Sequence, residues 1–199
     1  MTKEKLLDIA ERVVIALLAV KFVMGFTPSL ESHPYNWLLL FSEMATVVII
    51  MLRRSGAVAM GIYPIVIGFI GTALPLVVRP VANTIAPISL AIAIMGIGIM
   101  ISLAAKLFLN RSFGIVAANR GTKRTGPYRL IRHPMYAGYI LTQMGFLMLN
   151  FSTWNLVIYA VAWTTQVLRI REEEAFLMQD QAYRDYASAV GSRLIPGVF

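Results

Sequence analysis

The side chains best suited to chemistry fall in two short polar stretches of the second half of the chain. The first, residues 120–136, reads RGTKRTGPYRLIRHPMY and carries Arg and Lys but no Asp or Glu, together with one of the only two His residues. The second, Arg169 to Glu174, reads RIREEE and comes after one further apolar hairpin. A helical hairpin returns the chain to the side that it left. We therefore expect the two stretches to meet and to form the active site.

The composition places these stretches in an integral membrane protein. Of 199 residues, 58% are hydrophobic and 14% are charged, and the mean hydropathy is +0.70, which is too apolar for an ordinary soluble domain. A membrane span needs about 20 apolar residues, so this length fits one all-α helical bundle. We predict a single membrane domain over residues 1–199, with four N-terminal spans in 1–109 and the cofactor-binding and catalytic part in 110–199.

Charge and residue usage exclude several classes of site. The net charge of +8 comes from basic residues beside apolar segments, where they set topology and meet anionic lipid headgroups, so nucleic acid is not an expected partner. The chain has no Cys, and its two His have no neighbouring metal ligands, so a protein metal site is not expected. The chemistry must use an organic cofactor or simple polar groups.

The apolar runs predict about six membrane segments. Four full spans are expected, followed by a short helical hairpin whose second helix Ser152 or Thr153 would cap. The spans are residues 10–26, 37–52, 57–78 and 85–109, and the hairpin helices are 136–149 and 154–168. Residues 171–190 are polar with one apolar side and predict a C-terminal cytoplasmic helix lying over the site.

Basic residues predict the orientation of these segments. The N-terminus, Arg53-Arg54, Lys106 and the loop from Arg111 to Arg132 are rich in Lys or Arg, which marks the cytoplasmic side. Both termini and the active site of this multi-pass protein are therefore expected in the cytoplasm. Arg79 is an exception, since it ends the third span on the outer side.

Two features inside the spans invite a functional interpretation. Glu43 is a carboxylate within the second span, but it follows the start of that span by about two turns. We therefore expect it to face water or to pair with Lys21, outside the active site. The spacing Gly96-x-Gly98 lacks the preceding strand and third glycine of a nucleotide-binding loop, so close helix packing explains it better.

The polar stretches also carry the motifs of a known family. The chain resembles the isoprenylcysteine carboxyl methyltransferase family, whose wider relatives include membrane phospholipid N-methyltransferases. The resemblance covers residues 111–196. It rests on Gly126-Pro127-Tyr128, Arg132-His133-Pro134-Met135-Tyr136-Ala137-Gly138, Arg169, Glu173-Glu174, Leu177, Tyr183 and Tyr186.

This resemblance implies a membrane enzyme that uses S-adenosyl-L-methionine and takes a lipid-like acceptor from the bilayer. His133 would donate to the carboxylate of the cofactor and Glu173 would pair with its ammonium, while Pro134 would hold the turn so that the backbone reaches the ligand. Tyr128, Met135 and Tyr136 would line the adenine or sulfonium region. The cofactor-binding set implied is Tyr128, His133, Pro134, Met135, Tyr136, Gly138, Glu173 and Glu174.

Arg169 matches the substrate-binding Arg of that family and is the predicted catalytic residue. It shares a helix face with Glu173, four residues further on. Its guanidinium would hold the carboxylate of an isoprenylcysteine-type acceptor in line with the methyl group, since methyl transfer to an ionised carboxylate depends on alignment and charge.

Three alternatives stay open. A phospholipid amine acceptor would need a base, with Glu172 or Glu174 as candidates. A sterol-type reductase would bind NADPH near the Arg residues around Tyr128, although Glu173 and Glu174 would repel its phosphate. A lipid-binding or transport protein without enzymatic activity would carry charged residues deep in several spans, and in this sequence Glu43 is the only clear one.

Overall fold

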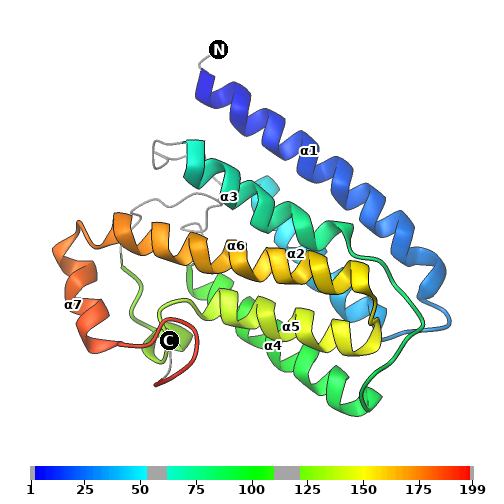
Figure 1. Cartoon of the computed structure of the whole chain (residues 1–199). Helices are drawn as coiled ribbons and strands as arrows, with labels where there is room; N and C mark the ends of the chain where they lie inside the picture. Colours follow the sequence, from blue (N-terminus) through cyan, green and yellow to red (C-terminus); the bar gives the residue numbers. More distant parts are fainter. Residues whose placement is uncertain (1–2, 53–61, 110–121, 198–199) are drawn as a thin grey trace.

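Six long helices lie side by side and alternate in direction, and a seventh crosses one end of the bundle (Figure 1). The computed structural model describes residues 3–52, 62–109 and 122–197. Within these ranges the chain is all-helical. The α-helices are α1 Lys3–Phe26, α2 Asn36–Leu52, α3 Ile62–Ala73, α4 Ile88–Leu109, α5 Pro134–Leu149, α6 Thr153–Leu177 and α7 Gln181–Ala189. The short 3-10 helices are η1 Thr27–Ser29, η2 Leu74–Val77 and η4 Gly126–Arg129.

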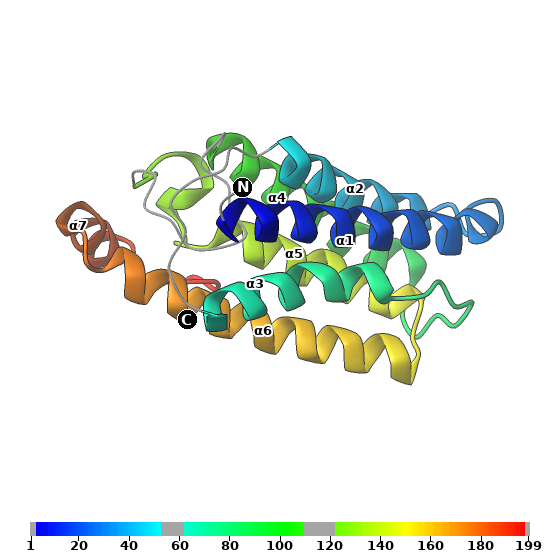
Figure 2. The ribbon, with the colours of Figure 1, turned by 90° about the horizontal axis from the view of Figure 1, so that it is seen from above.

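The alternation brings the start of α1, the start of α5, the end of α6 and the whole of α7 to the same end of the bundle, which we call the site end. The view from above shows the same arrangement, with α7 at that end and the α5–α6 connection at the other (Figure 2). The two polar stretches identified in the sequence therefore come together at the site end, as predicted from the hairpin between them.

Helices α4 and α5 pack against each other closely because small residues face one another. A Cβ on Gly138 would lie 2.6 Å from the Gly98 carbonyl oxygen and from the Ser102 nitrogen, and a Cβ on Gly145 would lie 2.6 Å from the Ala91 carbonyl. The close packing predicted for Gly98 is confirmed. A Cβ on Gly96 would meet no atom within 4 Å, so that prediction was wrong for Gly96, which points away from the interface.

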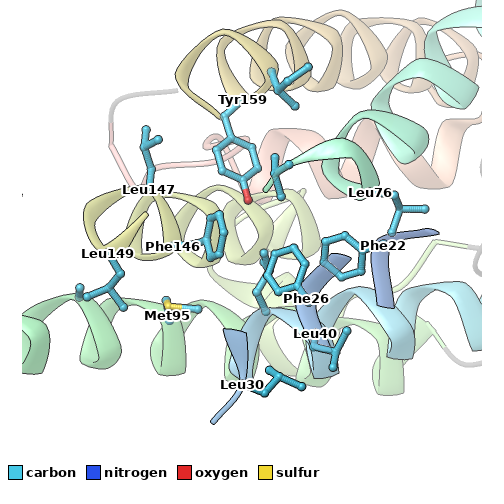
Figure 3. Close-up of a cluster of buried hydrophobic side chains, with 14 of the residues drawn as sticks. Phe22, Phe26, Leu30, Leu40, Leu76, Met95, Phe146, Leu147, Leu149 and Tyr159 are labelled. Carbon is cyan, nitrogen blue, oxygen red and sulfur yellow. The ribbon is translucent and has the colours of Figure 1, made fainter. Parts of the chain in front are cut away.

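An aromatic core and three buried asparagines hold the opposite end. Figure 3 shows the rings of Phe22, Phe26, Phe146 and Tyr159 gathered between α1, α5 and α6. Beyond them, Asn150 donates to Asn36 at 3.1 Å, and Asn155 bonds both the nitrogen and the oxygen of Arg79, at 3.0 and 2.8 Å. The Arg79 guanidinium lies 4.9 Å from the Trp154 ring centroid. This cation–π contact gives Arg79 a partner at the end of the bundle opposite the site end, where no basic residue was expected.

Several predicted boundaries need correction. The first span, expected at 10–26, is part of a longer helix, α1, that begins at Lys3, and the third span, expected at 57–78, ends as α3 at Ala73 followed by η2. The predicted helix 171–190 is instead the continuation of α6 to Leu177 and a separate helix, α7, whose start Asp180 caps by accepting from Ala182 N at 2.8 Å. Ser152 caps α6 as predicted, accepting from Asn155 N at 3.1 Å. Arg53-Arg54, Ala57, Arg111 and Arg120 lie outside the described residues.

Among the described residues, one helix is both long and apolar enough to cross a membrane by length and composition, namely α4, Ile88–Leu109. Asn36–Leu52 and Ile62–Val77 are shorter apolar helices. The expected set of about six segments is not established by this criterion. Large apolar side chains nevertheless point outward from several helices, with Leu52 78%, Ile62 82% and Leu107 78% exposed. Such outward apolar side chains suit contact with lipid.

Candidate active site

The first polar stretch is fixed to the bundle through η4. Gly126 begins this turn with a φ of +61°, and a Cβ there would lie 2.6 Å from the Phe108 ring, so both backbone and space favour glycine. The Tyr128 hydroxyl donates to the Ala105 carbonyl at 3.4 Å, and the Tyr186 hydroxyl donates to the Tyr128 carbonyl at 2.7 Å. Tyr128 therefore ties the stretch to α4 and α7.

The C-terminal tail supports the next residues from the other side. The backbone N–H groups of Arg132 and His133 donate to the carbonyls of Ser192 and Arg193, each at 2.9 Å. Pro134 then begins α5, where the absence of an N–H costs no helical hydrogen bond. This places the His133 ring at the start of α5, facing the end of α6.

Glu174 is the centre of a buried ionic cluster. Its carboxylate accepts from Arg132 Nε at 2.6 Å and Nη2 at 3.2 Å, from Arg193 Nε at 2.6 Å and from His133 Nε2 at 3.2 Å. Burial alone would raise the pKa of Glu174, but the hydrogen bonds from His133, Arg132 and Arg193 outweigh it and lower this pKa to about 2. Arg132 also donates to the Val190 carbonyl at 2.8 Å. Glu174 therefore joins α6 to the first stretch and to the tail.

Glu173 has different partners. The Tyr136 hydroxyl donates to Glu173 Oε1 at 2.6 Å, and Arg169 Nε lies 3.8 Å from the same oxygen, as the four-residue spacing predicted. The Arg169 guanidinium lies 5.4 Å from the Tyr136 ring centroid. His133 Nδ1 is 3.8 Å from Glu173 Oε2, so the imidazole stands between the two carboxylates. The Glu173 side chain stays 18% exposed, against 5% for Glu174.

A cavity of about 30 Å³ lies behind Tyr136 and Arg169, between α2, α3, α5 and α6. By volume it has room for one or two water molecules. The polar part of its wall consists of Glu43, Thr46, Thr72, Tyr139, Gln143 and Gln166. The cavity connects the predicted catalytic residue with the middle of the bundle.

Several residues predicted to bind the cofactor are buried and contact other parts of the chain. Gly138 faces the backbone of α4, where it permits close packing. Tyr128, Met135 and Tyr136 are 6%, 6% and 2% exposed, so they pack inside the bundle and do not present an open aromatic surface for adenine. His133, predicted to donate to the cofactor's carboxylate, faces two carboxylates of the chain instead.

Lys106 is a buried cation that was not predicted from the sequence. Predicted to mark the cytoplasmic boundary, it is 5% exposed, donates to Thr46 Oγ1 at 2.8 Å and lies 4.8 Å from the Tyr139 ring centroid. It interacts electrostatically with Glu43, whereas Lys21, the predicted partner, is exposed. Lys106 continues the helical spacing of Met95, Gly98 and Ser102 along the inward face of α4. This pattern could have predicted that Lys106 points into the bundle.

Comparison with known families identifies the class. The model of the phospholipid methyltransferase family matches residues 86–185, half of the chain, from the start of α4 to the middle of α7. The protein is therefore a membrane methyltransferase, and the chain belongs to the phospholipid methyltransferase family. No curated protein matches the chain. The match supports the wider group named in the sequence analysis and does not single out the isoprenylcysteine enzymes.

Methyltransferases of this family generally use S-adenosylmethionine, and the donor set at the site end suits its methionine portion. An ammonium group needs a carboxylate with an accessible edge, and Glu173 keeps such an edge while Glu174 is enclosed by Arg132, His133 and Arg193. Tyr136 and His133 orient Glu173 from two sides. We therefore regard Glu173 as the residue best placed to hold the ammonium.

Proposed function

We propose that the protein methylates the amine of a phospholipid-like acceptor, using S-adenosylmethionine bound at the site end. The family match carries this proposal, because residues 86–185 include the whole constellation from Tyr128 to Glu174. S-adenosylmethionine, when bound, supplies the methyl group on a positively charged sulfur. Glu173 holds the ammonium of the cofactor, while Glu174, Arg132 and Arg193 keep the surrounding backbone in place.

Arg169 binds the acceptor in this proposal, as expected from the sequence, but through a different group. A phospholipid has a phosphate beside its amine, and a guanidinium matches a phosphate with two parallel hydrogen bonds. Arg169 is 7% exposed and lines the cavity beside Tyr136. Binding of the phosphate to this guanidinium, on the side away from the cavity, fixes the amine a short distance away, within reach of the methyl group.

The amine must lose a proton before it can attack, and Glu174 is unsuited to accept it. Hydrogen bonds from His133, Arg132 and Arg193 hold its carboxylate and lower its pKa to about 2. A general base works best when its pKa is near the working pH. Glu174, one of the two candidate bases named from the sequence, is therefore not the base in this proposal.

Carboxyl methylation of an isoprenylcysteine-type acceptor is the second candidate. Arg169 favours it, because the same guanidinium can hold a carboxylate bidentately. No base is needed for such an acceptor, since a carboxylate is already ionised near neutral pH.

We further propose a single multi-pass membrane domain with both termini and the site on the cytoplasmic side. The alternating helices and the outward apolar side chains support a multi-pass domain, and the basic residues of the site end support its cytoplasmic orientation. Because the chain has no Cys, single cysteines introduced at Lys123 and at Ser32 test it by labelling in sealed vesicles. Labelling of position 123 from the outside alone would reverse the orientation.

The acceptor is tested with purified protein in vesicles and a methyl-labelled cofactor. Phosphatidylethanolamine, phosphatidylcholine and a prenylcysteine analogue are supplied in separate reactions. The proposal expects label in phosphatidylethanolamine, while phosphatidylcholine, which has no amine proton to lose, is the negative control. Label in the prenylcysteine analogue alone would favour carboxyl methylation. Oxidation of NADPH without any methyl transfer would favour a reductase.

A further inference from the structure

Glu43 lies in the same cavity as Arg169 and has no part in the mechanism above. It is 9% exposed and lies near the middle of α2, and within the described part of the chain no hydrogen bond reaches its carboxylate. A buried carboxylate is costly unless it is paired or solvated. Glu43 lines the cavity, so water in the cavity is the available partner.

Two further buried polar atoms of the cavity residues would bond to the same water. Gln166 Oε1 and the Tyr139 hydroxyl are buried without a hydrogen-bond partner among the described residues, and both side chains line the cavity. Buried waters typically bond to polar groups that are otherwise unsatisfied. One or two waters bonded to these atoms would form a chain of hydrogen bonds from Glu43 toward Tyr136 and Arg169.

We propose that Glu43 is the acceptor of the proton that the amine must lose, received through water in this cavity. The inference rests on the proposed function, since a carboxylate acceptor has no such proton. An N–H bond of the acceptor's ammonium breaks, the proton passes along the water chain, and an O–H bond forms on Glu43. The neutral amine then forms a bond to the methyl carbon as the carbon–sulfur bond of the cofactor breaks, leaving S-adenosylhomocysteine.

The charged and titratable groups around Glu43 suit this role. Lys106 on α4 interacts with it electrostatically and is held in position by Thr46, one turn from Glu43. Arg169 on α6 borders the other part of the cavity. On α1, Arg12 donates to the Met51 carbonyl, two turns further along α2, and Lys21 is exposed. Of the residues that the structure describes, Tyr136 and Tyr139 also line the cavity, and Tyr159 interacts electrostatically with Glu43.

The test compares Glu43→Gln with Glu31→Gln, an exposed carboxylate in the α1–α2 connection, using phosphatidylethanolamine vesicles across a range of pH. Removing a base should lower kcat about 100-fold near neutral pH, with the residual rate rising toward alkaline pH as the amine loses its proton to solvent. Binding of S-adenosylhomocysteine, measured by calorimetry, should not change. Glu31→Gln should behave as the wild type.

Gln166→Leu tests the water chain without changing the carboxylate, and it covers the case in which Glu43→Gln does not fold. It should lower kcat while leaving S-adenosylhomocysteine binding intact. A Gln166→Leu variant with wild-type kcat, a Glu43→Gln variant with a wild-type pH profile, or equal loss of binding and turnover in Glu43→Gln would each overturn the relay. Wild-type protein that does not methylate phosphatidylethanolamine would overturn the proposed function itself.

Discussion

Glu173 and Glu174 are neighbours on α6, yet their carboxylates have opposite surroundings. Glu174 is 5% exposed in its side chain and is held by Arg132, His133 and Arg193, whereas Glu173 is 18% exposed and accepts one short hydrogen bond, from Tyr136. Successive residues of a helix point about 100° apart. One carboxylate therefore faces the tail and braces the fold, while the other faces the site.

Tyr136→Phe should weaken cofactor binding without unfolding the protein. The substitution removes the hydroxyl that donates to Glu173 at 2.6 Å and leaves the ring beneath Arg169. A hydrogen bond of this kind contributes about 1 kcal/mol, or roughly fivefold in affinity. Calorimetry with S-adenosylhomocysteine measures the loss. Tyr159→Phe is the matched control, because its buried hydroxyl has no hydrogen bond among the described residues, and unchanged affinity in both variants would remove Tyr136 from the site.

Gly138→Ala should destabilise the protein by forcing α4 and α5 apart. The new methyl group would lie 2.6 Å from backbone atoms of Gly98 and Ser102, and overpacking of this kind costs about 1–3 kcal/mol. Thermal unfolding in detergent measures this loss of stability. Gly96→Ala, on the open side of α4, should be neutral or slightly stabilising. Equal stability of the two variants would contradict the packing role.

The Glu174 cluster predicts a specific dependence of stability on pH. Its pKa is lowered from 4.5 to about 2 in the folded protein, so the folded state holds this proton less tightly than the unfolded state. The resulting stabilisation, about 3 kcal/mol, is complete above pH 4.5 and is lost as the pH falls toward 2. Glu174→Gln should therefore be less stable than the wild type at pH 7, with a difference that shrinks below pH 4.5. A constant difference down to pH 3 would contradict the cluster.

Lys106 and Glu43 should behave as a coupled pair. Lys106→Met leaves the buried carboxylate without its cation, and breaking a buried pair of charges costs about 3 kcal/mol or more. Adding Glu43→Gln to Lys106→Met should recover part of that loss, because the remaining charge is then removed. Lys21→Met, at an exposed position, is the control for loss of a cation. Strictly additive effects on thermal stability would show that the two residues do not interact.

Local patterns predicted most of the helices. Apolar runs of suitable length located α2, α4 and α5 to within a few residues, and the Ser152 cap followed from residue type alone. The Arg169–Glu173 contact followed from helical spacing. These features depend on residues that are close together in the sequence, so the sequence alone predicts them.

Contacts between helices were harder to predict. Lys106 was assigned to the membrane boundary, because its inward direction depends on Thr46 and Tyr139, which are far away in the sequence. Glu174 was assigned to the cofactor, because nothing local indicates that Arg193 reaches it. Gly138 was included with the motif around it, although its role is set by Gly98 on α4. Each of these contacts involves a partner on another segment of the chain, far away in the sequence.

Binding of S-adenosylhomocysteine to Glu173→Gln and Glu174→Gln tests the central assignment most directly. Loss of the Glu173 charge should weaken binding by ~1.5–3 kcal/mol, the range for a hydrogen bond to a charged group, with little change in thermal stability. Glu174→Gln should lower thermal stability, and the folded fraction should bind nearly as tightly as the wild type. Unchanged affinity in Glu173→Gln, or a larger loss in Glu174→Gln than in Glu173→Gln at a temperature where both are folded, would contradict the account.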